Sequence, residues 1–352
     1  MDARAAGWTR RLRGIFLAVF IGAVATRFGP LAPLIGAPVM ALAAGLVIGP
    51  IAGLVRTRAW DAVQPGIAFA GKRLLQLAIV VLGLTVPLGE ALRIGGATLP
   101  VLLGSLAAAL ATAWLLARAL GLGPQLGALI GVGTSICGAS AIAATAPIVA
   151  APATLVALAV TTVFAYNLAA VLVFPWLGHL LGMSQEAFGL FAGTAVNDTS
   201  SVVAAASIYG PEAAEAAVVV KLTRTLMIVP ITIVLALLVE RHPALAGGAA
   251  DEAAPRPARK PAWRVVPWFI IGFVLASALA SLLEPSGAIA AAAPTLRVLA
   301  TVLISSALAA IGLETDLAAF RRAGWRPLAF GGLLWLVVTG SCLGLMAATG
   351  WL

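Results

Sequence analysis

The sequence predicts an all-α polytopic membrane protein with about 11 transmembrane helices, inverted repeats and two discontinuous helices. The first observation is composition: 62% of the 352 residues are hydrophobic and 10% are charged, whereas a soluble domain carries about 25% charged residues. The second is a succession of apolar stretches of about 20 residues, the length that crosses a bilayer. The third is that polar residues interrupt two of these stretches.

The N-terminal segment resembles a signal peptide, because three arginines precede an apolar run and Ala23-Val24-Ala25 lies within it. Many apolar segments follow, so we expect this run to remain as the first transmembrane helix. The candidate spans are residues 12–28, 35–55, 72–92, 98–120, 124–150, 153–181, 187–209, 213–240, 264–284, 294–316 and 327–350.

The basic residues predict the orientation, because Lys and Arg accumulate on the cytoplasmic side of a membrane. A cytoplasmic N-terminus leaves only Arg27, Arg93 and Arg297 outside. The two remaining cations lie within a span. Because the number of predicted crossings is odd, the C-terminus is expected outside. The inside set is Arg4, Arg10, Arg11, Arg13, Arg56, Arg58, Lys72, Arg73, Arg118, Arg241, Arg256, Arg259, Lys260, Arg264, Arg321, Arg322 and Arg326.

The one long loop, residues 241–262, is rich in Pro, Ala and charged residues, as a flexible cytoplasmic linker would be. We expect a single transporter domain over residues 1–352, with eight spans in residues 1–240 and three in residues 263–352. An internal repeat supports inverted topology, because its two copies enter the membrane in opposite senses. Gly83-Leu84, Leu88, Arg93 and Gly95 match Gly312-Leu313, Leu317, Arg322 and Gly324.

Two spans are broken by small and polar residues, at 131–141 and at 193–201. The breaks resemble each other, because Gly133-Thr134, Ser140 and Ala144 align with Gly193-Thr194, Ser200 and Ala204. Non-helical backbone at membrane depth is tolerated only where it is buried in protein or lines a cavity. We interpret the breaks as a binding site. Close helix packing through small residues is the alternative.

Lys221 and Arg224 lie one helical turn apart inside the span 213–240, and Pro230 is expected to kink that helix. An ionisable group at membrane depth costs roughly 3 kcal/mol on insertion scales and usually serves a substrate, an ion or a partner. Snorkelling to the interface is the alternative. Two cations near one carboxylate predict a site for a small anion. The predicted substrate-binding residues are Thr134, Ser135, Cys137, Gly138, Ser140, Asn197, Thr199, Ser200, Ser201, Lys221 and Arg224.

Asp198 is predicted to couple transport to an ion. A desolvated carboxylate has a raised pKa that a neighbouring cation lowers again, so such a group can load and release a proton. A structural ion pair with Lys221 or Arg224 is the alternative. A substrate anion could also compete with Asp198 for the same cations.

Several classes of function are not expected. Two cysteines, both in apolar segments, and two histidines offer no metal-ligand spacing and no cofactor site. Nothing resembles a P-loop, and the placement of the basic residues argues against a nucleic-acid partner. An intramembrane enzyme is the rival hypothesis, because Gly138-Ala139-Ser140 superficially fits a serine-protease loop. No base is placed for that serine, since His179 lies at a span end and His242 in the linker. No His-Glu-x-x-His motif is present.

Three motifs resemble those of the YeiH-type family of bacterial inner-membrane proteins, which is labelled as sulfate exporters. They are residues 131–144, 193–205 and 220–224, and the resemblance spans nearly the whole chain. Some family members carry His-Glu where this chain has Asn197-Asp198. The resemblance implies the superfamily of cation–proton antiporters and bile-acid symporters, crossed broken helices, elevator-type movement and a homodimer.

The resulting functional prediction is a secondary active transporter of a small anion, such as sulfate or a sulfonate, coupled to H⁺ or Na⁺. It would lie in the bilayer of the bacterial inner membrane. A cation–proton antiporter that uses Asp198 is the second reading. In that case Lys221 and Arg224 would be structural counter-charges.

Overall fold

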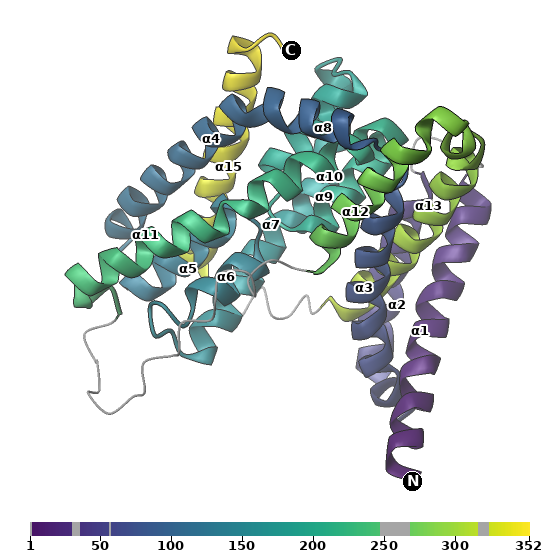
Figure 1. Ribbon diagram of the computed structural model, residues 1–352. Coiled ribbons are helices and arrows are strands. Elements are labelled where there is room, and N and C mark those ends of the chain that lie inside the picture. Colours follow the sequence, from purple (N-terminus) through teal and green to yellow (C-terminus); the bar gives the residue numbers. More distant parts are fainter. Residues whose placement is uncertain (1, 30–35, 56–57, 247–267, 316–323) are drawn as a thin grey trace. The chain divides into compact units, whose positions relative to one another are not determined.

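The computed structural model describes residues 2–29, 36–55, 58–246, 268–315 and 324–352. These residues form helices and the turns that connect them, and contain no β-strand (Figure 1). The prediction of an all-α membrane protein is confirmed, and six of the described helical stretches are long and apolar enough to cross a membrane. The helices are α1 (Asp2–Phe28), α2 (Gly36–Val55), α3 (Arg58–Gly83), α4 (Leu88–Ala119), α5 (Pro124–Ser135), α6 (Ala139–Thr145), α7 (Ala153–Leu180), α8 (Gln185–Ala195), α9 (Thr199–Tyr209), α10 (Pro211–Leu226), α11 (Ile228–Arg241), α12 (Trp268–Leu283), α13 (Ala288–Glu314) and α15 (Trp325–Ala348).

The chain forms two compact units that both draw on early and late parts of the sequence. The first contains the described residues of Met1–Ala91, Ala206–Pro211 and Trp268–Leu317, and the second those of Leu92–Ala205, Glu212–Pro267 and Ala318–Leu352. The expected division at a linker stays a prediction. Of that linker, the structure describes the end of α11 and a short 3-10 helix at Pro243–Ala246. The remainder lies outside the described residues.

In the first unit, α13 packs against α1, α2 and α3, and α1 also packs against α2 and α3 (Figure 1). Small residues allow the close approach: a Cβ on Gly45 would lie 2.9 Å from the Cα of Gly312, and one on Gly66 would lie 2.8 Å from the Cα of Gly14. Packing of this kind is how helices associate where lipid removes the hydrophobic driving force. The core is built from Ala18, Ile21, Ala25, Ala41, Ile67, Ala70, Ala309, Ala310 and Leu313.

In the second unit, α5 and α6 form a helical hairpin that enters and leaves on one side. At 12 residues, α5 is about 18 Å long, roughly half the hydrocarbon core. Near its start, Gln125 Nε2 donates to the carbonyls of Val149, at 2.9 Å, and Ala150, at 3.0 Å. Near its end, a Cβ on Gly133 would lie 2.7 Å from Ile142 Cγ1. The two arms therefore lie together along their length, and the segment is re-entrant.

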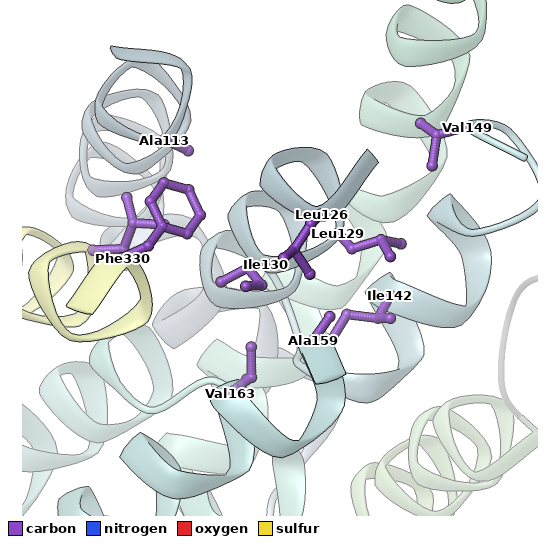
Figure 2. Packing of buried hydrophobic residues seen from close by; sticks show 10 residues of the cluster. Ala113, Leu126, Leu129, Ile130, Ile142, Val149, Ala159, Val163 and Phe330 are labelled. Atoms are coloured by element: carbon purple, nitrogen blue, oxygen red, sulfur yellow. The ribbon is translucent and has the colours of Figure 1, made fainter. Parts of the chain in front are cut away.

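Apolar packing holds this hairpin in place. Figure 2 shows side chains of α5 directed toward α6 on one side and toward α4 and α15 on the other. Because α5 is covered on several sides by protein, its short length leaves little backbone exposed to lipid, as a re-entrant segment requires. The residues of this cluster are Ala113, Leu126, Leu129, Ile130, Ile142, Val149, Ala159, Val163, Phe330 and Leu334.

The segment formed by α8 and α9 is a second hairpin of the same kind. Gln185 Oε1, at the start of α8, accepts from the backbone N–H of Glu212, at 3.0 Å, and of Ala213, at 3.3 Å. Both donor N–H groups lie at the start of α10, so the chain has returned to the level at which α8 began. Consistently, α8 and α10 run parallel, with Gly189 beside Ala216 and Gly193 beside Val220.

The two hairpins form an inverted repeat. Helix α4 runs antiparallel to α5, with Ala117 beside Gly127 and Ala113 beside Gly131. Since the first hairpin returns to the side where α4 ended, α7 must run opposite to α4, and the second hairpin enters from the other side. The elements correspond at a spacing of 60 residues: α5 and α8 end at Ser135 and Ala195, and α6 and α9 begin at Ala139 and Thr199.

The predicted count of eleven crossings is therefore not confirmed, because segments 124–150 and 187–209 turn back. Charge patterning could not detect this, since loops 150–153 and 181–187 contain no Lys or Arg. An ion pair of 2.8 Å between Arg93 and Glu186 supports the revised topology. The eleven-span prediction would place these two residues on opposite sides. The other predicted repeat stays a prediction, because Leu317 and Arg322 lie outside the described residues.

Candidate functional site

The tips of the two hairpins meet inside the second unit. Residues 136–138 join α5 to α6, and residues 196–198 join α8 to α9. A Cβ on Gly138 would lie 3.4 Å from the Cβ of Asp198, and Gly138 has a φ of 65°. These two residues occupy equivalent positions in the 60-residue repeat, so the hairpins touch where a twofold relation between them would bring equivalent atoms together.

Lys221 joins the two tips. Its side chain is fully buried, and its Nζ donates to the carbonyl of Ile136 at 2.9 Å and to that of Val196 at 2.8 Å. The two acceptors are again equivalent residues of the repeat, each directly after the last residue of a hairpin's first arm. Because a helix carries partial negative charge at its C-terminus, one ammonium here stabilises two helix ends at once.

Arg224 lies one turn further along α10 and is also fully buried. Its Nε donates to the carbonyl of Ser135 at 2.9 Å. Its Nη1 and Nη2 have no hydrogen-bond partner in the described part of the chain. A buried charge is costly unless it is paired and hydrogen-bonded. Snorkelling is therefore ruled out for both cations, and Arg224 retains unused capacity for an anion.

The helix that carries these cations ends at Leu226, and α11 begins at Ile228. The interruption at Met227 follows from Pro230, which has no N–H to donate and whose ring conflicts with the carbonyl four residues earlier. The expected kink is thus confirmed at this position. It places the cations in the last turns of α10, beside the hairpin tips.

Asp198 does not form an ion pair with either cation among the described residues. It is half-buried, and its Oδ2 accepts from the backbone N–H of Ser200 at 3.0 Å and from the Ser200 hydroxyl. This is the geometry of an N-terminal cap on α9, where a carboxylate also interacts favourably with the helix dipole. The carboxylate lies close enough to Lys221 for their charges to interact. The alternative of a direct structural ion pair is not what the structure shows.

Sequence reasoning missed Asn167 on α7. Its Oδ1 accepts from the backbone N–H of Asn197 at 3.0 Å and of Asp198 at 3.3 Å, so it stabilises the tip of the second hairpin. The side chain is 2% exposed. A single amide within the otherwise apolar segment 153–181 is the signal that could have identified it.

Replacement of Asn167 by Leu is expected to destabilise the protein by about 2–3 kcal/mol, because two backbone N–H groups at the tip lose their acceptor. Thermal unfolding of the purified protein would measure this. Thr162→Val is the matched control, since among the described residues the Thr162 hydroxyl donates within its own helix, to the carbonyl of Leu158 at 2.9 Å. Equal destabilisation by both substitutions would contradict a specific role for Asn167 at the tip.

The remaining predicted site residues differ in how deeply they are buried and in whether they contact the two cations. Asn197 is fully buried, and neither polar atom of its side chain has a partner in the portion of the chain described. Cys137 is 2% exposed and lies near the charge of Lys221. Ser140 is exposed on α6. No hydrogen bond of the described residues links the following to the two cations: Thr134, Ser140, Thr199, Ser200 and Ser201.

The charged side chains where the hairpin tips meet are those of Lys221, Arg224 and Asp198. Among the described residues, no group of three or more His, Cys, Asp or Glu side chains could hold a metal. His179 lies in the last turn of α7 and His242 directly after α11, both away from the tips. Two buried cations and one half-buried carboxylate leave a net positive charge where the hairpins meet.

Comparison with known proteins gives matches over nearly the whole chain. The family model described as conserved hypothetical protein 698 matches residues 13–331. The UPF0324 membrane protein spr0034 of Streptococcus pneumoniae is 38% identical over 341 residues, which is 96% of this chain and 97% of that protein. The UPF0324 membrane protein spyM18_1033 of Streptococcus pyogenes is 37% identical over 345 residues, which is 97% of this chain and 98% of that protein. No solved structure matches.

Proposed function

The chain belongs to the conserved hypothetical protein 698 family, the YeiH-type family of membrane proteins, and we propose that it is a secondary active transporter of a small anion. The observation that carries the proposal is the excess of buried positive charge at the meeting point of two inverted re-entrant hairpins. Arg224, with two nitrogens that have no partner among the described residues, is the centre of that charge.

The hairpin architecture supports transport. Irregular backbone at membrane depth persists only where protein or a cavity surrounds it, and inverted repeats with broken helices form midplane substrate sites in many secondary transporters. Here one hairpin reaches the tips from each side of the membrane. A movement of either hairpin would therefore change the side from which the tips are reached.

The charges support an anion as the substrate. Lys221 is occupied by two helix-end carbonyls, which are neutral groups. Arg224 donates to one carbonyl, and its other two nitrogens have no partner in the part of the chain that the structure describes. An ionised group that is buried without a counter-charge is unfavourable, so an incoming anion would gain from both cations.

Asp198 is the proposed coupling group. It caps α9 through Ser200 while it is ionised, and a proton would remove both its charge and part of its capacity to accept. Protonation would thus leave the positive charge of the tips fully available to a substrate. Proton-driven uptake is the coupling that follows, and sodium remains the other candidate ion.

A cation–proton antiporter is the second candidate, because Asp198 is free of an ion pair with Lys221 and Arg224 within the described residues and could bind a cation itself. Asp198→Asn should abolish transport in both cases. Lys221→Ala and Arg224→Ala should both remove anion recognition. Arg224→Ala, which leaves the Lys221 contacts with both tips in place, should leave some cation exchange. An intramembrane enzyme is not proposed, because the exposed Ser140 has no histidine beside it.

Reconstitution in liposomes tests the proposal. Uptake of labelled sulfate and labelled methanesulfonate would be measured under imposed proton and sodium gradients, with wild type beside the double variant Lys221→Ala/Arg224→Ala. Gradient-dependent uptake that the double variant loses is the expected result. Equal uptake by both proteins would contradict the site, and cation exchange without anion uptake would favour the antiporter.

A further inference from the structure

We infer that the anion at this site is a monovalent oxyanion of the sulfonate or carboxylate type, held by Arg224 together with the hydroxyls of Thr194 and Ser135. The inference rests on the proposed anion transport and narrows its substrate class. It assigns the substrate to the inner ends of α5 and α8, next to α15, rather than to the exposed hydroxyl of Ser140.

The first support is a group of buried polar atoms without partners. Thr194 is fully buried, as are Ser135 and Arg224. Their Oγ1, Oγ, Nη1 and Nη2 atoms have no hydrogen-bond partner within the described ranges. Buried polar groups in native proteins are nearly always hydrogen-bonded, so a group of such atoms indicates a ligand or ordered water that completes it.

The second support is that these residues lie together. Arg224 Nε donates to the Ser135 carbonyl at 2.9 Å, which places the guanidinium beside Ser135. Helix α15, which carries the buried Cys342, packs against both α8 and α5, and Cys342 lies near the charge of Arg224. Thr194 and Ser135 are each in the last two residues of a hairpin's first arm. The two hydroxyls therefore lie at the inner ends of two hairpins that pack against α15, near one guanidinium.

The net charge of the site indicates the charge of the anion that it would bind. Lys221 and Arg224 carry two positive charges, and Asp198 carries one negative charge. While Asp198 is ionised, one net positive charge remains, which a monovalent anion neutralises. Sulfate would then leave a net negative charge in a buried site unless Asp198 took up a proton, and uncompensated buried charge is strongly unfavourable.

Geometry decides the chemical type. The guanidinium is a planar fork that binds two oxygens of one acceptor group. The Thr194 and Ser135 hydroxyls can each donate to an additional oxygen lone pair. A carboxylate or sulfonate presents two or three oxygens on one face, which matches these donors. Methanesulfonate and sulfate share a tetrahedral sulfur and differ chiefly in charge, so they form a matched pair of probes.

The test measures binding of methanesulfonate and sulfate to the purified full-length protein in nanodiscs by calorimetry at pH 7.5 and constant ionic strength. Wild type is compared with Thr194→Val, which removes one hydroxyl, and with Ser305→Ala. Ser305 is the control because its hydroxyl is also fully buried and without a partner among the described residues, but lies on α13 in the other unit. Methanesulfonate should bind wild type at least tenfold more tightly than sulfate. Thr194→Val should weaken methanesulfonate binding at least tenfold and Ser305→Ala less than twofold.

The inference is overturned if sulfate binds as tightly as methanesulfonate, if neither anion binds, or if Thr194→Val behaves like Ser305→Ala. The comparison of the two anions needs no variant, so it holds even if a substitution prevents folding. Flux separates the two proposals. Sulfate transport with tight sulfate binding would leave the transporter proposal standing and the monovalent site overturned. Selective methanesulfonate binding without flux of either anion would support the monovalent site and overturn the transporter proposal.

Discussion

Replacement of Lys221 by Met is expected to destabilise the protein by about 2–5 kcal/mol and to loosen the contact between the hairpin tips. Methionine keeps a similar length but removes the ammonium, so the carbonyls of Ile136 and Val196 both lose their donor. A buried polar group without a partner costs about 1–3 kcal/mol. No other described side chain donates to both carbonyls, so the loss falls on the two tips together.

The reactivity of Cys137 would report this loosening, because that thiol lies in the first tip and is 2% exposed. In a Cys342→Ala background, Lys221→Met should raise the rate of Cys137 modification by a thiol reagent at least tenfold. Lys72→Met is the control, since Lys72 is exposed on α3. An unchanged rate together with unchanged thermal stability would show that Lys221 does not hold the tips.

The re-entrant topology predicts from which side of the membrane each introduced cysteine will react. Cysteines introduced at Gly123 and Thr154, which flank the first hairpin and are exposed, should react with a membrane-impermeant reagent from the same side. Cysteines at Leu181 and Glu212, which flank the second hairpin and are exposed, should react only from the other side. The reason is that each hairpin begins and ends at one level, as the contacts of Gln125 and Gln185 show.

The experiment uses oriented vesicles of a variant that lacks Cys137 and Cys342, with one cysteine introduced at a time. Labelling of Gly123→Cys and Thr154→Cys from opposite sides would mean that segment 124–150 crosses the membrane. An exposed control at Arg93→Cys should react from the same side as Leu181→Cys, because Arg93 pairs with Glu186.

Much of the site could be predicted from residue types alone. Intramembrane Lys221 and Arg224 were recognisable because their burial in an apolar segment is costly, and both prove fully buried. The two breaks were recognisable from Gly, Ser and Thr within apolar runs. The roles of the cations could not be predicted, since the acceptors of Lys221 are backbone carbonyls 85 and 25 residues away. Every residue carries such a carbonyl, so it leaves no mark in the sequence.

The amino-acid sequence alone indicates that the chain is a helical membrane protein, where its apolar segments lie, and that polar residues interrupt two of them. Hydrophobicity sets those features residue by residue, because each buried side chain is transferred from water to an apolar environment. The folded structure is needed to show that the interruptions are hairpin turns rather than kinks. An apolar segment of 27 residues can cross a bilayer or fold back within it. The choice depends on what covers the folded backbone, and here α4, α7, α10 and α15 provide that cover from distant parts of the chain.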